Sequence, residues 1–352
     1  MSVLDHGDRL VGLRHTFSRV FPEKVDLDIS VAIPTYNGGD RLAAVLECLR
    51  WQLNIHNLSW EIIVVDNNSS DHTSEVVRHY QREWRSHTVP LRYVFEPKQG
   101  AAYARQQAIQ IAASSLVGFL DDDTLPSMTW LISAYRFAQA HPQAGVIASR
   151  IRGNFETNPP QNFERIASLL ALTERGSQPL MYVPEKKVVP PSAGMVVRRQ
   201  AWLDNVPKEL VLTGRTGTSM LTGEDTESIL HIQRAGWDVW YNPGMRLQHQ
   251  IPSNRLTRQY LQKLCRGIGL SRYRTRMLSV YLWQRPLILP LYTANDIRKI
   301  VIHCLRYRQD IIQDDVAACE LTLYLASLIS PLFMIQRSLK QQFQKHRLFP
   351  SR

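Results

Sequence analysis

The chain has 352 residues, of which 44% are hydrophobic and 21% charged, with a formal net charge of +11. This is the composition of a folded protein with one large domain or two smaller ones, and it excludes a disordered, collagen-like or disulfide-stapled chain. The basic balance indicates anionic partners, such as nucleotide phosphates, acidic lipids or nucleic acid, without choosing among them.

The first half of the chain alternates short apolar runs with helical patterns. An N-terminal extension over 1–28 comes first, with scattered charges and no apolar core of a signal peptide. Apolar, β-branched runs then predict strands at 29–33, 62–65, 91–95, 116–120 and 145–148. Helical patterns lie between the earlier runs, at 41–52, 73–85 and 101–113. This alternation predicts an α/β fold of βαβ units, with a mostly parallel central sheet covered on both faces.

The middle of the chain, about 150–250, is more irregular. It contains two proline-rich stretches near 158–160 and 189–191 and a Gly/Thr-rich loop at 213–223, and a predicted strand at 237–241 closes it. Ordered loops of this length usually carry function, so we expect part of the site here.

The last hundred residues are predicted to be helical and basic. The segment 255–276 has seven Lys or Arg residues and no acid, and the stretch 321–336 is uncharged. That stretch is shorter than the ~20 apolar residues of a spanning helix, so it predicts a buried core helix or an interfacial helix. Because basic residues attract anionic lipid, we expect peripheral contact with a membrane. The alternative is that the stretch packs on the rest of the protein and the arginines are solvated or bind phosphate.

The cysteines indicate a reducing compartment. They lie far apart, form no CxxC pair, and are Cys48, Cys265, Cys304 and Cys319. Buried, reduced thiols of this kind are typical of intracellular proteins. We therefore expect a cytoplasmic protein, on the inner face of the membrane if it touches one.

Three segments carry polar groups suited to a nucleotide. The strand at 29–33 runs into Pro34 and Tyr36, and the tyrosine offers an aromatic face to a base. Asp66 follows the next strand and can accept hydrogen bonds from a base or ribose, while Arg105 lies early in a helix that Gly100 opens. Ligands of parallel sheets lie beyond the carboxyl ends of the strands. Each segment alone is also typical of an ordinary turn or a solvated arginine.

Three adjacent carboxylates, Asp121, Asp122 and Asp123, follow the predicted strand at 116–120. Like charges at the end of a buried strand repel one another unless a cation or strong donors compensate them. Hard oxygen ligands suit Mg²⁺ or Mn²⁺, which commonly bridge carboxylates and substrate phosphates. The sequence therefore predicts a divalent metal site, with a structural acid cluster before Pro126 as the alternative.

A second acidic pair, Glu224 and Asp225, stands at the start of the helical pattern that continues to Ala235. A carboxylate there can serve as an N-cap or as a general base. His249 is expected to follow the strand at 237–241 after a loop, and a lone histidine of this kind is more often structural than a metal ligand.

In this order and spacing, the motifs resemble glycosyltransferase family 2 over about residues 29–250. The segments that carry the resemblance are 34–37, 65–69, 100–105, 121–123 in the place of the DxD motif, 223–225 and His249. A closer likeness, at 158–165, 236–237, 249–252 and 266–272, is to cyanobacterial transferases assigned to hormogonium exopolysaccharide biosynthesis.

The resemblance implies a GT-A catalytic domain over 29–250, followed by a helical C-terminal region over 251–352, and an inverting sugar transfer from a UDP- or GDP-linked donor. It implies a Mg²⁺ or Mn²⁺ ion on Asp121, Asp123 and His249. It implies Asp225 as general base, with Glu224 helping to place the acceptor. The nucleotide would be held by Pro34, Tyr36, Asp66, Arg105, Asp121 and Asp122, and the sugar pocket lined by Gly194 and Met195.

The number of sugars added is indicated by a departure from the family pattern. Processive synthases of the family carry a QxxRW motif and several membrane spans, and neither is found in this sequence. We therefore expect single sugar additions and not a polymerase. The expected acceptor is a saccharide or a polyprenyl-linked sugar, whose anionic head and apolar tail would suit the basic and apolar segments of the C-terminal region, and no nucleic acid partner is expected. Two alternatives are a sugar-phosphate nucleotidyltransferase, which would need a Gly-rich basic loop after the first strand, and a non-enzymatic nucleic-acid-binding protein that uses the basic segment 255–276.

Overall fold

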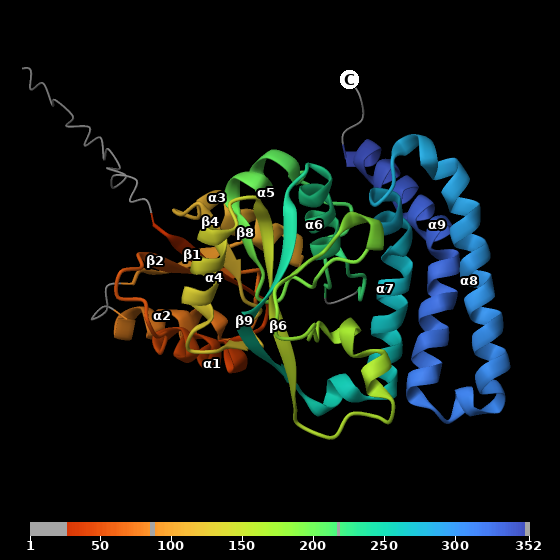
Figure 1. Cartoon of the computed structure of the whole chain (residues 1–352), viewed down its shortest axis with the longest axis horizontal. Coiled ribbons are helices and arrows are strands. Elements are labelled where there is room, and N and C mark those ends of the chain that lie inside the picture. Colours follow the sequence, from red (N-terminus) through yellow and green to blue (C-terminus); the bar gives the residue numbers. More distant parts are fainter. Residues whose placement is uncertain (1–26, 85–88, 217–218, 349–352) are drawn as a thin grey trace, which may run out of the picture.

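The computed structural model describes residues 27–84, 89–216 and 219–348 (Figure 1). The N-terminal extension expected at 1–28 lies almost entirely outside the described residues.

The first half of the sheet is parallel, as expected. The strands lie in the order β3 (Leu91–Phe95), β2 (Trp60–Asp66), β1 (Ile29–Thr35) and β4 (Leu116–Phe119). Every residue of β2 and β4 is buried, because these runs are apolar and helices cover both faces of the sheet. The connecting helices are α1 (Gly39–Arg50), α2 (Thr73–Glu83) and α3 (Ala101–Ile111).

The second half of the sheet reverses direction at β8 (Val196–Arg198), a strand that the sequence did not predict. It pairs antiparallel with both β4 and β6 (Ala144–Phe155). β6 then pairs in parallel with β9 (Asp238–Ile251), and β9 carries the short strands β5 (Thr124–Pro126) and β7 (Leu180–Met181). The sheet is therefore mixed, and the α/β fold class is confirmed.

One expectation about this half was wrong. β9 does not end near residue 241 but continues to Ile251, so His249 lies within this strand and no loop separates the two. The reason is the pairing on both sides of β9, since β6 follows it as far as Ile251 and β5 pairs His249 with Thr124. Backbone groups of a buried segment need such partners.

Two apolar layers flank the sheet. On one face, α1, α2 and α4 (Trp130–Ala140) pack on alternate strand residues, such as Val31, Ile62 and Val64. On the other face, α3, α5 (Arg199–Asn205) and α6 (Glu224–Arg234) pack on the intervening residues, such as Ala32 and Ile63. Successive side chains of a strand point to opposite faces, which explains the division.

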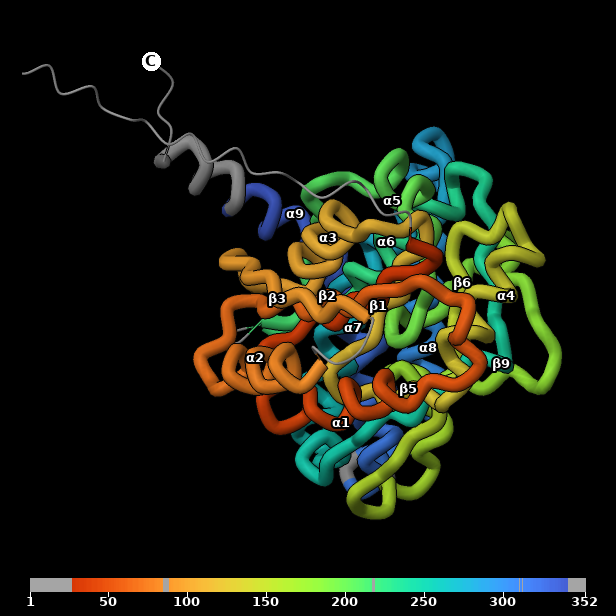
Figure 2. Tube along the Cα trace, turned by 90° about the vertical axis from the view of Figure 1, so that its left-hand side faces the viewer, coloured from red at the N-terminus to blue at the C-terminus, as the bar shows by residue number. Residues whose placement is uncertain are grey.

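The C-terminal helices form a further layer beside the sheet (Figures 1 and 2). They are α7 (Arg258–Leu278), α8 (Arg285–Tyr307) and α9 (Asp315–Leu348), with α9 packed on both others. Short 3-10 turns lie at η2 (Phe163–Arg165), η3 (Ala167–Leu170), η4 (Pro184–Lys186), η5 (Ser253–Leu256), η6 (Leu282–Gln284) and η7 (Arg308–Ile312). A shared apolar cluster joins this layer to the rest, because Leu170 and Ile251 pack with Leu264 of α7 and Leu323 of α9.

Most arginines of the basic segment 255–276 point inward, which corrects the expectation that they form a free basic surface. The ion pairs are Arg255–Asp123, Arg258–Asp315, Arg274–Glu227 and Arg276–Asp296. Lys263 and Arg266 remain exposed. The segment therefore mainly ties α7 to its neighbours.

Candidate active site

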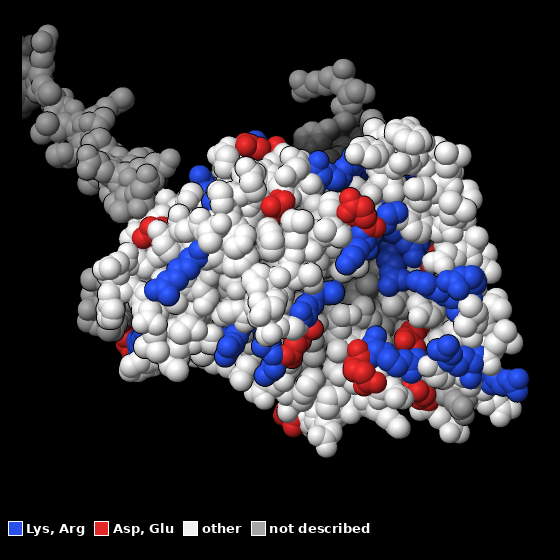
Figure 3. Space-filling model, viewed as in Figure 1, with Lys and Arg blue, Asp and Glu red and all other residues white. Residues whose placement is uncertain are grey.

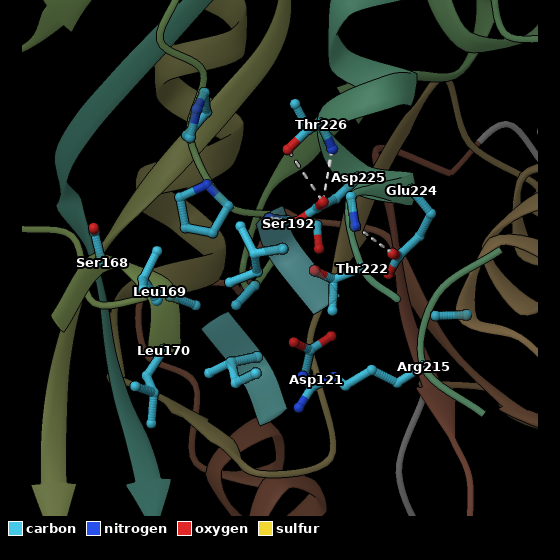
Figure 4. Close-up of a pocket in the computed structure, with 18 of the residues that line it drawn as sticks. Asp121, Ser168, Leu169, Leu170, Ser192, Arg215, Thr222, Glu224, Asp225 and Thr226 are labelled. Atoms are coloured by element: carbon cyan, nitrogen blue, oxygen red, sulfur yellow. Dashed lines mark hydrogen bonds between the residues drawn. The ribbon is translucent and has the colours of Figure 1, made fainter. Parts of the chain in front are cut away.

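A cavity of about 650 Å³ opens between the carboxyl ends of the parallel strands and α7. Its walls come from parts of the chain that are far apart in sequence, among them the three aspartates after β4, the start of α6, residues 190–193, and α7. Figure 4 shows Asp121, Glu224, Asp225 and Ser192 around this space. The position agrees with the rule that open α/β sheets bind ligands beyond the carboxyl ends of their strands.

Asp122 holds the loop that carries the site. One oxygen, Oδ2, accepts a hydrogen bond from Thr35 Oγ1 at 2.6 Å and another from Arg41 Nη2 at 3.0 Å, while Oδ1 accepts from Arg41 Nε at 3.1 Å. Burial raises the pKa of this carboxyl. A Cβ on Gly38 would lie 2.4 Å from Asp122 Oδ2, so the turn after β1 needs glycine there. Nucleotide binding by Asp122 would compete with these bonds.

Arg105 lies between two of the predicted site acids. Its guanidinium donates from Nη1 to Glu224 Oε1 at 3.1 Å and from Nη2 to Asp121 Oδ1 at 3.3 Å. Burial opposes the charge, but the two carboxylates outweigh it and raise the pKa of Arg105. Burial, followed by the charge of Asp225, raises the pKa of Glu224. The structure thus brings three predicted residues together in one bridge.

Asp123 and His249 meet because β5 and β9 are paired in register. Thr124 lies opposite His249, which sets Asp123 Oδ2 3.5 Å from His249 Nε2. The other ring nitrogen, Nδ1, is 2.9 Å from the carbonyl oxygen of Leu170, an arrangement that leaves Nε2 toward Asp123. Burial opposes ionisation of Asp123, but the hydrogen bonds and charges of His249 and Arg255 hold the pKa of this carboxyl well below its usual range.

Arg255 places a positive charge at the point where the sequence predicts a metal. Its Nη1 lies 2.6 Å from Asp123 Oδ2 and 3.4 Å from His249 Nε2. Across the described parts of the chain, no three His, Cys, Asp or Glu side chains converge into a preassembled metal site. Even so, carboxylates and an imidazole whose other ring nitrogen is held by a hydrogen bond are ligand types that suit Mg²⁺ or Mn²⁺. The guanidinium of Arg255 shows that this position favours a cation.

Asp225 differs from the other acids of the cavity. Its Oδ1 accepts from the backbone N of Thr226 at 2.7 Å, and its Oδ2 accepts from the backbone N of Ser192 at 3.3 Å. Among the described residues it forms no ion pair, whereas Asp121, Asp122, Asp123 and Glu224 each contact an arginine. Gly223, at φ +109°, turns the chain into α6 and sets Asp225 at the cavity wall.

The predicted nucleotide residues divide into two groups. Pro34 and Tyr36 line both the main cavity and a smaller one of about 100 Å³, which Gly100 and Arg215 also line. Asp66 is buried behind this wall, where Oδ1 accepts from the backbone N of Ser69 at 2.9 Å and Oδ2 from the hydroxyl of Tyr93 at 2.6 Å. Asp66 therefore orders the turn after β2, and its contact with a nucleotide stays a prediction.

The predicted sugar-pocket residues are displaced by a few positions. Residues 190–193 line the cavity, while Met195 is fully buried in the core beside β4, and the carbonyl of Gly194 accepts a hydrogen bond from Ser149 Oγ. The side chain of Met195, just before β8, packs in the core and therefore does not line the cavity. The expectation for Gly194 and Met195 is therefore corrected to the stretch just before them.

Several residues at the cavity escaped the sequence reasoning. Arg41 and Arg255 pair with the aspartates, and Ser192, Arg215 and Tyr260 lie on the walls. Arg255 was counted only as part of a basic segment. The long contacts, from 41 to 122 and from 123 to 255, leave no local pattern in the sequence.

Comparison with known proteins gives one family match. Residues 30–206 match the family described as Glycosyl transferase family 2. The chain is 35% identical over 96 residues to a putative teichuronic acid biosynthesis glycosyltransferase of Bacillus subtilis, a stretch that covers 27% of this chain and 35% of that protein. It is 27% identical over 226 residues to a pre-mycofactocin glycosyltransferase of Mycobacterium tuberculosis, which covers 63% of this chain and 42% of the relative. The matches thus span less than half of either relative.

Among solved structures, the fold is similar to that of a mannosyltransferase of Pyrobaculum calidifontis in complex with GDP-Man and Mn²⁺. The TM-score is 0.55 at 18% sequence identity, and the alignment covers 93% of this chain and 90% of that one. At this identity the likeness concerns the fold alone.

Proposed function

The chain belongs to glycosyl transferase family 2 and has a GT-A-like fold, and on that basis we propose that it moves one sugar from a nucleotide diphosphate donor to an acceptor hydroxyl, with inversion. Membership of this family sets aside the nucleotidyltransferase and nucleic-acid-binding alternatives.

The donor nucleotide would lie along the wall formed by Pro34, Tyr36 and the start of α3. The smaller cavity between these segments has the aromatic Tyr36 and the basic Arg215 on its walls, which suits a base and the adjoining phosphates. Asp121, whose carboxylate is about one-third exposed, projects toward the main cavity beyond it. UDP- and GDP-linked sugars both fit this description.

A divalent ion, Mg²⁺ or Mn²⁺, would be held by Asp121, Asp123 and His249. When bound, it supplies positive charge that offsets the diphosphate and stabilises the departing nucleoside diphosphate. Arg255, which now contacts Asp123 and His249, carries charge of the same sign at this position. The metal ion would then either displace the guanidinium of Arg255 from Asp123 or bind beside it.

Asp225 would act as the general base. An acceptor hydroxyl in the cavity gives its proton to a carboxylate oxygen of Asp225, and the acceptor oxygen forms a bond to the anomeric carbon while the bond to the diphosphate oxygen breaks. The single displacement inverts the anomeric configuration. The observation that carries this assignment is that Asp225 lines the cavity yet has no cationic partner among the described residues, so its charge is available for a proton.

Glu224 would act by position. Its ion pair with Arg105 fixes the first turn of α6 against Asp121, and this holds Asp225 beside Ser192.

We infer a polysaccharide-building role, with a saccharide or polyprenyl-linked acceptor, in the cytoplasm and with peripheral contact to the membrane.

The decisive variant is Asp225→Asn. The amide keeps the size of the side chain but cannot accept the proton, so transfer should fall by about 10² to 10⁴ while donor affinity is retained. Donor affinity is measured by thermal shift with UDP-, GDP- and dTDP-sugars plus Mn²⁺. Asp204→Asn, on the exposed side of α5, is the matched control and should behave as wild type. Loss of donor binding in Asp225→Asn would instead make Asp225 part of the donor site.

A further inference from the structure

Helix α8 is held to the protein by only one side. Of its 23 residues, Asp296 and His303 are the ones fully buried, and α9 is the helix on which it packs. In Figure 1, α8 forms the outer edge of the molecule, on the side of the helical layer away from the sheet. Most of its surface therefore faces outward.

The outward surface of η6 and α8 is apolar to an unusual degree. Leu282, Trp283, Leu287, Leu291 and Leu305 are each between 66% and 71% exposed. Along α8, one series of exposed positions follows steps of three and four residues, from Leu287 through Leu291, Ala294, Arg298 and Val301 to Leu305. This spacing defines one continuous stripe along a helix. We call it the α8 stripe.

The exposed charges on the stripe and beside it have one sign. The acid of this segment, Asp296, is buried in an ion pair with Arg276, whose Nη1 lies 2.5 Å from Asp296 Oδ2. Arg298 and Arg306 are exposed. In Figure 3 the outer edge over α8 is white and blue, and the red side chains lie further in. The stripe therefore presents apolar and basic groups without an exposed acid between Tyr281 and Tyr307.

This charge pattern argues against a second copy of the chain as the partner. In a two-fold dimer the same surface occurs on both sides, so Arg298 of one copy would face a stripe that offers no carboxylate. An anionic lipid surface complements both features, since it accepts apolar side chains and attracts the arginines.

The neighbouring helix α9 shows why the contact is peripheral. By length and composition, Asp315–Lys340 is apolar enough to cross a membrane. Its inner side, however, is part of the protein core, where Glu320 pairs with Arg165 and Ser327 accepts a hydrogen bond from Arg272 Nη1 at 3.2 Å. A spanning orientation would break these contacts and strip α9 from α7. A helix lying in the plane of the interface keeps them.

We propose that the α8 stripe, together with Leu282 and Trp283 of η6, is a membrane-docking surface for anionic lipid. This proposal refines the membrane contact of the proposed function, and it rests on the proposed function only for the membrane location. Vesicle binding can be measured without any sugar transfer.

The test uses the full chain with vesicles of phosphatidylcholine alone or with about one-third phosphatidylglycerol. Wild type should float with the anionic vesicles at low salt and be partly released at high salt, since exposed charges are screened. The triple variant Trp283→Ala, Leu287→Gln, Leu291→Gln should bind about tenfold less or weaker still. Arg298→Glu should weaken binding to anionic vesicles specifically. The matched control, Trp51→Ala, Leu53→Gln, Met128→Gln, changes exposed apolar residues of the catalytic body and should bind as wild type.

Three results would overturn the proposal. The first is full-length protein that stays in the soluble fraction with anionic vesicles at low salt, and the second is a triple variant that binds vesicles as wild type does. The third is wild-type protein that does not bind vesicles but self-associates, with the self-association abolished in the triple variant. Donor thermal shifts are recorded for every variant. A triple variant that binds donor normally but no longer floats confirms that the stripe is separate from the site. Wild-type protein that binds no donor would count against the proposed function alone.

Discussion

At the scale of single residues, the cavity is organised by pairing guanidinium groups with carboxylates. Arg41 neutralises Asp122, Arg105 bridges Asp121 and Glu224, and Arg255 holds Asp123. A buried charge without a partner would lower the stability of the fold, and Arg105, Asp122, Asp123 and Glu224 are all buried. These ion pairs therefore stabilise the cluster of acids before any ligand binds. What remains for chemistry is Asp225, whose donors among the described residues are two backbone N–H groups and the hydroxyl of Thr226, together with the places where a ligand can displace an arginine.

Asp123 offers a test of the metal site. Asp123→Asn removes one predicted ligand and the charge that faces Arg255, so we expect Mn²⁺ affinity, measured by calorimetry in the presence of nucleoside diphosphate, to fall by about tenfold or more. Circular dichroism should show that the fold survives. If the variant binds Mn²⁺ as tightly as wild type, Asp123 is only the partner of Arg255. Asp204→Asn again serves as the matched control.

His231 predicts a pH dependence of stability. It lies on α6, and its Nε2 is buried without a hydrogen-bond partner among the described residues. Burial lowers the pKa of this imidazole below its ordinary 6.5. The unfolded chain then binds the proton more tightly than the folded protein, so stability falls as pH decreases through 6.5 toward the folded pKa.

Urea unfolding at pH 7.5, 6.5 and 5.5 measures this effect. We expect His231→Gln to flatten the decrease relative to wild type, because glutamine does not titrate. His79→Gln, at an exposed position on α2, should leave the slope nearly unchanged. Equal slopes in wild type and His231→Gln would mean that other groups cause the pH dependence.

At the scale of elements, α7 is the helix that closes the cavity, and its position depends on a close contact with α9. A Cβ at Gly269 would lie 2.5 Å from Ala326 Cβ and 2.8 Å from the carbonyl oxygen of Leu323. Neither is the end of a flexible side chain, so the two backbones would have to separate. The helices can approach this closely because glycine lacks a side chain.

The sign of one substitution tests this contact. In an exposed helix, Gly→Ala adds about 1 kcal/mol of stability through helix propensity. At Gly269 we expect the reverse, a loss of about 1 to 3 kcal/mol, because overpacking outweighs propensity. Urea unfolding gives the difference, and Arg266→Ala on the exposed side of α7 is the control. A gain in stability for Gly269→Ala would show that the helices separate without cost.

The elements also show where prediction from sequence succeeds. The parallel strands and their helices were predictable, because continuous apolar runs such as 62–65 have one plausible buried state. β8 and the full length of β9 were not, since short strands and long pairings depend on partners distant in the chain. The same limit applies to the site. Asp225 and Asp123 follow local patterns, whereas Arg255 becomes a site residue only through the fold.

At the scale of the whole molecule, the boundary expected near residue 250 separates the family motifs from the helical region. The residues on its two sides nevertheless share one apolar core. The cluster around Leu170 contains Phe163 and Ile166 from the catalytic half, Leu261 and Leu264 from α7, and Val316 and Leu323 from α9. The carbonyl oxygen of Leu170 also lies within hydrogen-bond distance of His249 Nδ1. The predicted metal ligand is therefore supported by a core that α9 completes.

This arrangement predicts the outcome of truncation. A chain ending at residue 313 loses α9 and exposes the apolar residues that α9 covers, so we expect it to be aggregation-prone and to lose donor binding. The full chain should unfold in one transition, with tryptophan fluorescence and far-UV circular dichroism changing at the same urea concentration. Trp130 and Trp202 report on the two faces of the sheet, since both are fully buried there. A soluble fragment 1–313 that still binds donor would show that the helical layer is a separate domain. In that case, deleting α9 would be a clean test of membrane binding; otherwise only surface substitutions on α8 can separate docking from folding.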